Sequence, residues 1–169
     1  SLALKSGGAV PVEQIAEQYL GYELEFVDDD GALPSDVIGG IDFDTNTIII
    51  NSAIENHLGR YSFTVAHEIA HHVLHRDLFL KARSGDSIMC RGGEVRPIEE
   101  VQADRFAEAL LMPISTIVNN CKKANGFIGY SRRRRLALAA KAIKLTGINN
   151  VSVSAMEMRL MHLGYLPPY

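Results

Sequence analysis

The segment TVAHEIAHHVLH, residues 64–75, restricts the fold of this chain more than any other stretch. It carries four of the 6 histidines and a glutamate, set among apolar residues. The apolar residues in and just before it recur at helical spacing: Phe63, Ala66, Ile69, Ala70, Val73 and Leu74. Because this spacing places side chains on one face of a helix, residues 62–75 are expected to form an amphipathic helix. The fold must cover that face and accommodate several imidazoles.

The remaining sequence predicts further helices and a small sheet. Helices are expected at residues 10–21, 99–112, 132–145 and 154–163, the last with a capping box of Ser154 and Glu157 and a terminal Gly164. Residues 22–27 alternate like a strand, runs 37–44 and 47–51 predict a hairpin, and residues 82–97 predict a loop. The expected fold class is α+β, with a small mixed or antiparallel sheet and a C-terminal helical region.

Length and composition suit one compact domain. The chain has 169 residues, 47% of them hydrophobic, which is enough for a sizeable core. We expect a flexible leader at residues 1–9 and a single domain at residues 10–169. Roughly the last 40 residues are expected to form a helical, helix-turn-helix-like part of that domain.

Charge, hydropathy and cysteine content argue against several classes of protein. A net charge of -3 gives no strong attraction to nucleic acid or to an anionic membrane. The apolar stretches are well short of the ~18 residues that span a membrane, and the N-terminal SLALKSGG does not resemble a signal peptide. Cys90 and Cys121 lack CxxC spacing, which fits a reducing compartment. We therefore expect a cytoplasmic protein with no membrane partner.

An HExxH motif lies inside the expected helix at 62–75. Two imidazoles at positions i and i+4, His67 and His71, share one face and can converge on a single cation. Glu68 points about 100° away from His67 around the helix axis, so it can reach a metal-bound water without becoming a ligand. The motif therefore predicts a metal site with a carboxylate placed for proton transfer.

A catalytic zinc needs a third protein ligand, and the helix at 99–112 offers one. Glu100 and Asp104 form an ExxxD pair on one face of that helix. We predict Glu100 as the third ligand, with Asp104 accepting a hydrogen bond from the ring N–H of a ligand histidine. Glu99 remains the competing ligand, although it points about 100° away from Glu100 and lacks an i+4 partner.

The other two histidines of the segment have simpler interpretations. His72 is expected to be a surface residue or to support the site indirectly. His75 is expected to form a local hydrogen bond or to lie at the helix C-terminus, where a cationic imidazole suits the dipole. A metal-ligand role for His75 is the less favoured alternative. HExxH also occurs by chance, in which case the segment would be a helix with surface histidines.

The segments that carry HExxH and ExxxD resemble the ImmA/IrrE family of metallopeptidases. The resemblance is carried by RYSFTVAHEIAHHVLH and EEVQADRFAEALLMP, with weaker support from VPVEQIAEQYLG, IIIN and VSVSAMEMRLMHLGY, and it spans residues 10–165. It implies a zincin-like helical core and a gluzincin-like protease with one zinc per chain. It also implies ligands His67, His71 and Glu100, with Glu68 as the catalytic residue. The implied substrate is a helix-turn-helix transcriptional repressor of stress-response or mobile-element genes.

This sequence departs from the family pattern at one place. The family often has Glu-Ala-Asn where this chain has Gln102-Ala103-Asp104. Gln102 leaves Glu100 as the better ligand, and an aspartate can replace the asparagine as a hydrogen-bond acceptor.

The implied reaction is hydrolysis of a peptide bond. Glu68 would take a proton from a water activated by zinc and then deliver it to the leaving nitrogen. A second donor is needed for the tetrahedral oxyanion. By chemistry alone the candidates are Tyr61, Tyr130, Tyr165 and His162.

Two other classes of protein compete with the peptidase. Arginines at positions 132–135 open an expected helix, and the C-terminal helix resembles a recognition helix, which suggests a DNA-binding module; the acidic net charge argues against direct nucleic-acid binding. A regulatory protein with a structural zinc is the other class. Cys90 could then be a fourth ligand, or in a peptidase a latency switch. HExxH contains a glutamate that a structural site does not need, so we favour the peptidase.

Overall fold

In this computed structural model, the described residues are 8–28, 37–81, 88–90, 98–121 and 131–167. Most of the expected leader at residues 1–9 lies outside them. The chain divides into two compact units, one formed by residues 11–107 and the other by residues 1–10 with 108–169. Every residue of the metal site analysed below belongs to the first unit.

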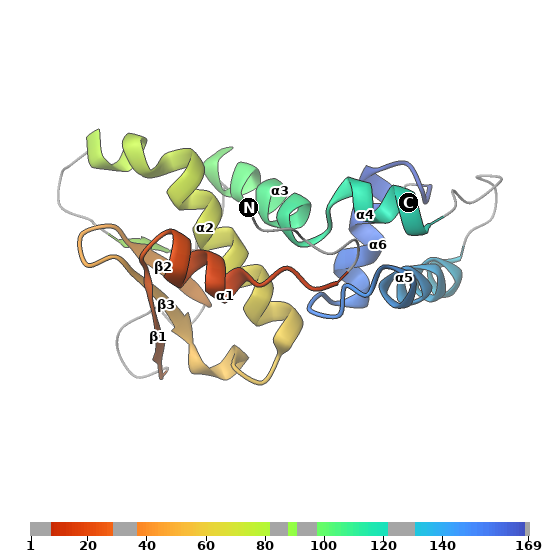
Figure 1. Cartoon of the computed structure of the whole chain (residues 1–169), viewed down its shortest axis with the longest axis horizontal. Coiled ribbons are helices and arrows are strands. Elements are labelled where there is room, and N and C mark those ends of the chain that lie inside the picture. The colour runs from red at the N-terminus through yellow and green to blue at the C-terminus, as the bar shows by residue number, and fades with distance from the viewer. Residues whose placement is uncertain (1–7, 29–36, 82–87, 91–97, 122–130, 168–169) are drawn as a thin grey trace. The chain divides into compact units, whose positions relative to one another are not determined.

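The first unit combines a small sheet with one long helix, as Figure 1 shows. Its chain runs through α1 (Val12–Gln14), a π-helical turn (Ile15–Tyr19), β1 (Glu23–Val27), β2 (Gly39–Asp42), β3 (Thr47–Asn51), a 3-10 turn (Ser52–Ile54), α2 (Leu58–Lys81), β4 (Ile88–Cys90) and most of α3 (Ile98–Leu111). Helix α2 packs against β2 and β3. This arrangement of helices and sheet confirms the α+β class.

The sheet is mixed and has the strand order β1-β3-β2-β4. Strands β2 and β3 form the predicted antiparallel hairpin, with Asp42 opposite Thr47, and β1 pairs with β3 in parallel. Ile48 and Ile50 alternate into the core from β3. Strand β4 lies within the segment predicted as a loop, and that prediction is wrong for residues 88–90. Three residues are too few to show the alternation from which a strand is recognised.

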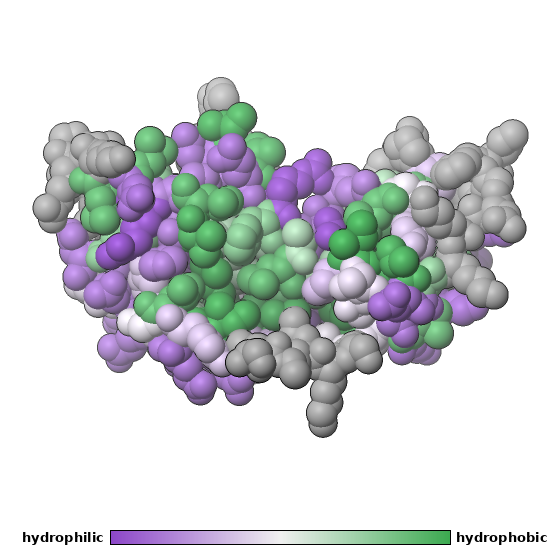
Figure 2. All heavy atoms as spheres, turned by 45° about the horizontal axis from the view of Figure 1, so that its top comes forward, coloured by the Kyte–Doolittle hydropathy of each residue, from purple (hydrophilic) through white to green (hydrophobic). Residues whose placement is uncertain are grey.

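Helix α2 is longer than predicted, and its buried side chains are not the same set as its predicted apolar face. It begins at Leu58 and ends at Lys81, and every residue from 65 to 71 is buried. Val73 and Leu74, which belong to the predicted apolar face, are exposed, whereas His71 and His75 are buried. Figure 2 shows apolar side chains together with polar ones on one face of the molecule. Histidines therefore occupy the interior positions of α2 that leucine or valine normally fills.

The second unit is helical in its described part. It contains α4 (Ile114–Asn120), α5 (Arg132–Thr146) and α6 (Val153–His162), and α5 packs against α6. Helix α5 ends at Gly147, whose φ of 71° is the left-handed conformation that glycine adopts most readily. Helix α4 was not predicted from the sequence, because seven residues after a proline carry little periodicity.

The predicted capping box of α6 is wrong. The N-cap is Ser152, whose hydroxyl accepts a hydrogen bond from the backbone N–H of Ala155. Glu157 instead binds the guanidinium of Arg135, with Nε and Oε1 2.9 Å apart, and both side chains are buried. Leaving a buried carboxylate without a charged partner costs more free energy than leaving out the second hydrogen bond of a capping box. This ion pair also removes one of the four consecutive arginines from the surface.

No helix among the described residues is both long and apolar enough to cross a lipid bilayer.

Candidate metal centre

Helix α2 supplies two of the three residues at the centre. His67 and His71 are one turn apart on the helix and are 0% and 1% exposed. Their Nε2 atoms face one another at 2.9 Å, because i and i+4 side chains lie on the same face. Two buried imidazoles that point at a common position are the arrangement that HExxH predicts.

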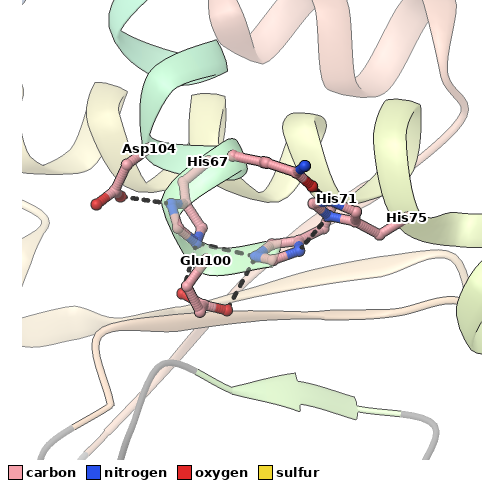
Figure 3. Close-up of polar contacts among 6 residues, drawn as sticks. His67, His71, His75, Glu100 and Asp104 are labelled. Carbon is pink, nitrogen blue, oxygen red and sulfur yellow. Dashed lines mark hydrogen bonds and ion pairs between the residues drawn. The ribbon is translucent and has the colours of Figure 1, made fainter. Parts of the chain in front are cut away.

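Helix α3 supplies the third residue. Glu100 Oε2 lies 3.2 Å from Nε2 of His67, and Oε1 lies 3.2 Å from Nε2 of His71. Figure 3 shows the carboxylate turned toward both rings. Within the described residues, these three form the group that could hold a metal ion, and Glu99 is not part of it. The tertiary fold thus brings Glu100 to two histidines that precede it by 29 and 33 positions in the sequence.

The donor atoms fit a small divalent cation. Ligand atoms at 2.0–2.1 Å from a tetrahedral zinc are about 3.3 Å apart from one another. The two histidine nitrogens lie 2.9 Å apart, and each lies 3.2 Å from a different oxygen of the Glu100 carboxylate, which is close to that value. Two imidazole nitrogens and one carboxylate oxygen also leave a fourth position of a tetrahedron open, which is the pattern of catalytic rather than structural sites.

The electrostatics of the cluster favour the protonation states that a metal requires. Burial lowers the pKa of the His71 imidazole, which favours its neutral form. Burial alone would raise the pKa of the Glu100 carboxyl, but its contacts with His67 and His71 lower the pKa by more, so the net pKa lies well below its ordinary value. A neutral imidazole and an ionised carboxylate are the forms that bind cations.

Asp104 lies against the far side of the His67 ring. Its Oδ1 is 3.0 Å from Nδ1 of His67, as Figure 3 shows. A carboxylate can only accept here, so Nδ1–H donates and the lone pair of a neutral ring is left on Nε2, facing Glu100 and His71. Asp104 follows Glu100 by one turn of α3, and the ExxxD pair therefore reaches both sides of one ring.

His71 has a different partner on its far side. Its Nδ1 lies 3.1 Å from Nδ1 of His75, and Nε2 of His75 lies 3.0 Å from Oε1 of Gln102. Because α2 continues to Lys81, the alternative that placed His75 at the helix C-terminus is wrong. Gln102 was not singled out as a site residue from the sequence, because residues two positions apart on a helix do not share a face.

Glu68 occupies a closely packed position between α2 and β2. Its side chain is 1% exposed. A Cβ added at Gly39, the first residue of β2, would lie 3.6 Å from Oε1 of Glu68 and would overlap Cγ2 of Thr64. Glycine therefore allows β2 to approach the turn of α2 that carries Glu68.

Substitution of Gly39 by alanine should test this close approach. We expect β2 to shift away from Thr64, destabilising the protein by about 1–3 kcal/mol, as overpacking of a core does. Denaturant unfolding measures this change. Adding Thr64→Ser removes the methyl group that clashes and should restore most of the stability. A double variant no more stable than Gly39→Ala would show that Thr64 does not limit the approach.

The remaining candidate residues lie in different parts of the protein. Tyr61 is buried on α2, its ring stacks on Phe26, and burial together with a hydrogen bond to Glu13 raises the pKa of its hydroxyl. Tyr165 and His162 belong to the second unit, where Nδ1 of His162 lies 2.8 Å from Oε1 of Glu108.

Three further residues complete this description. Tyr130 lies outside the described residues. Cys90 is the last residue of β4, and its side chain is likewise not described. Nδ1 of His72 lies 2.8 Å from the hydroxyl of Tyr22, so the ring bonds outside the cluster of donor atoms.

Comparison with known proteins gave one family match. The model of the family described as Peptidase_M78, IrrE N-terminal-like domain, matches residues 22–137. The match includes all of α2 and α3, and therefore every residue of the cluster. No curated protein matched the sequence.

Proposed function

This chain belongs to the Peptidase_M78 family of metallopeptidases, whose defining region is the IrrE N-terminal-like domain, and from that membership we propose that it is a zinc-dependent endopeptidase. One observation carries the proposal. The donor atoms of His67, His71 and Glu100 lie within 4.8 Å of one another, and the turn of α2 that carries the two histidines also holds the buried Glu68. A structural site would have no use for that carboxylate.

We propose zinc as the cation that this donor set binds. Two imidazoles and one carboxylate form the ligand set of several zinc hydrolases, whereas magnesium and calcium prefer oxygen ligands alone. The open fourth position would admit water and the substrate carbonyl. Bound zinc would supply Lewis-acid chemistry there by lowering the pKa of water toward 7 and polarising a carbonyl.

The residues of the chain divide the remaining work between them. His67, His71 and Glu100 hold the cation, and Asp104 orients the His67 ring. Glu68 accepts the proton of the attacking water and returns it to the leaving nitrogen, so that one carboxylate acts first as base and then as acid. Because Glu68 is buried, its proton transfer takes place away from bulk water.

We further propose that the substrate is a helix-turn-helix transcriptional repressor in the cytoplasm, and that its cleavage switches on stress-response genes. The support is the resemblance of the motif segments to the ImmA/IrrE family. The proposed reaction therefore removes a regulator rather than digesting proteins in general.

A DNA-binding role has one observation in its favour. Arg132, Arg133 and Arg134 are exposed at the start of α5, where they could meet phosphates. Against it, Arg135 is bound to Glu157 and the whole chain carries a net charge of -3. A broadly basic face is expected of a DNA-binding domain, and we therefore place this role second.

Reconstitution with metal tests the proposed function directly. The protein is loaded with one equivalent of zinc and incubated with helix-turn-helix repressors encoded beside its gene. Mass spectrometry should reveal cleavage at one or a few bonds, lost on chelation and regained when zinc is returned. Fully loaded protein that leaves every candidate repressor intact would contradict this substrate class. Cleavage that continued after complete chelation would contradict the metal mechanism.

A further inference from the structure

The His71 ring has polar neighbours on both sides, and the hydrogen bonds on its far side extend to the surface. Nε2 faces the metal centre, where Glu100 Oε1 lies 3.2 Å away. Nδ1 faces Nδ1 of His75 at 3.1 Å, and Nε2 of His75 faces Oε1 of Gln102 at 3.0 Å. Three side chains thus form one line of hydrogen bonds that starts at the metal centre and ends at an exposed amide.

The direction of this line follows from the acceptor at its outer end. The carbonyl oxygen of Gln102 can only accept, so Nε2–H of His75 must donate. A neutral imidazole carries one N–H, which makes Nδ1 of His75 an acceptor. Nδ1–H of His71 then donates to it, and the lone pair of His71 is left on Nε2, directed at the metal. The position of the proton on His71 is thereby linked to Gln102, which is two hydrogen bonds away.

We propose that His75 and Gln102 are positioning residues that hold His71 in its metal-binding tautomer. The inference rests on the proposed function in that it takes the centre to be a metal site. Asp104 has the same role for His67, but it acts directly on the ring. Each histidine of HExxH therefore has its own orienting group, and each arrangement ends on a residue of the α3 segment that carries Glu100, Asp104 for His67 and Gln102 for His71.

Because Gln102 is an amide, the donor and acceptor order of these hydrogen bonds can be reversed. The bond from His67 to the Asp104 carboxylate cannot be reversed. If the Gln102 amide turned over, its NH₂ group would donate to His75, and the proton order would invert along the whole line. His71 would then carry its proton on Nε2, where it would block the metal. A carboxylate at position 102 could only accept, and so permits only the metal-binding order.

Gln102 is a better position than His75 for testing the proposal by substitution, because the two side chains differ in burial. His75 is 4% exposed, so its replacement would disturb the interior of the unit. Gln102 is exposed and can be changed without altering the core. Val101, the preceding residue, is 43% exposed and provides a matched control on the same helix.

The experiment compares zinc dissociation constants by competition with a chromophoric chelator. Gln102→Met removes the acceptor at similar volume and unchanged charge, and should weaken zinc binding about tenfold, at the low end of outer-shell effects. Val101→Met should stay within about twofold of wild type, as expected for a surface change. Gln102→Glu should bind zinc at least as tightly as wild type. Val101→Glu adds the same charge beside it and measures how much of any gain in zinc affinity comes from charge alone.

Nitrogen-15 NMR of the zinc-loaded protein gives a readout that a purely structural role would not move. Wild type should carry the His75 proton on Nε2 and the His71 proton on Nδ1, and Gln102→Met should lose the single proton position at His75. Zinc affinity unchanged in Gln102→Met, or a wild-type His75 protonated on Nδ1, would overturn the inference alone. A wild-type chain that bound no zinc would overturn the proposed function and this inference together.

Discussion

Replacing Glu68 with glutamine is expected to abolish peptide cleavage and leave zinc bound. Glutamine has nearly the same volume, so it should fit the space beside Gly39 and Thr64 that the carboxylate now fills. Its amide cannot accept the proton of the attacking water. General acid–base groups contribute about 10²–10⁴-fold to rate, and Glu68 is proposed to act in both steps, so the loss should lie near the upper limit.

Measured kcat/KM on a cleaved repressor, together with zinc content by mass spectrometry, checks this expectation. Glu99→Gln is the matched control, because it makes the same chemical change at a partly exposed position outside the cluster. It should leave both quantities unchanged. Cleavage by Glu68→Gln at the wild-type rate would exclude Glu68 as the general base.

Removing the His71 imidazole should have the second large effect, the loss of the metal itself. The ring contributes one of three donor atoms, and the remaining two lie 3.2 Å apart on His67 and Glu100. Changes to outer-shell residues alone cost about 10–100-fold in metal affinity. The loss of a ligand in His71→Ala should exceed about 100-fold, and activity should fall with the bound zinc.

The neighbouring histidine offers the control for this experiment. His72 is partly exposed and bonds Tyr22 rather than the cluster, so His72→Ala should retain one equivalent of zinc. The same comparison can be made on α3 with Glu100→Ala and Glu99→Ala. Full zinc binding by His71→Ala would remove His71 from the ligand set. Loss of zinc in Glu99→Ala but not in Glu100→Ala would transfer the third ligand to Glu99.

Features set by short-range spacing could be predicted from the sequence. Helical periodicity identified α2, and the i, i+4 relation of His67 and His71 follows from helix geometry alone. The hairpin of β2 and β3 was predicted because two β-rich runs are joined by a short turn. The family match confirms the resemblance drawn from the two motif segments.

Features set by tertiary packing could not be predicted in the same way. Nothing local to Gln102 shows that α3 brings it to His75, 27 residues away. The burial of His75 and the exposure of Leu74 likewise depend on which side of α2 meets the rest of the unit. Ser154 was predicted in place of Ser152 as the cap of α6 because both serines lie at the start of a helical pattern. The structure distinguishes them by the hydrogen bond from Ala155 N–H to Ser152 and by the ion pair of Glu157 with Arg135.

The complete burial of residues 65–71 has a consequence for how the protein loses its metal. The segment carries two ligands and the general base, and each of its residues is at most 2% exposed. Its backbone amides should therefore be among the slowest to exchange with deuterated solvent, opening only when the whole unit unfolds. Heat inactivation of the zinc-loaded protein should then coincide with unfolding of that unit, without an earlier stage in which the helix frays and releases the ion.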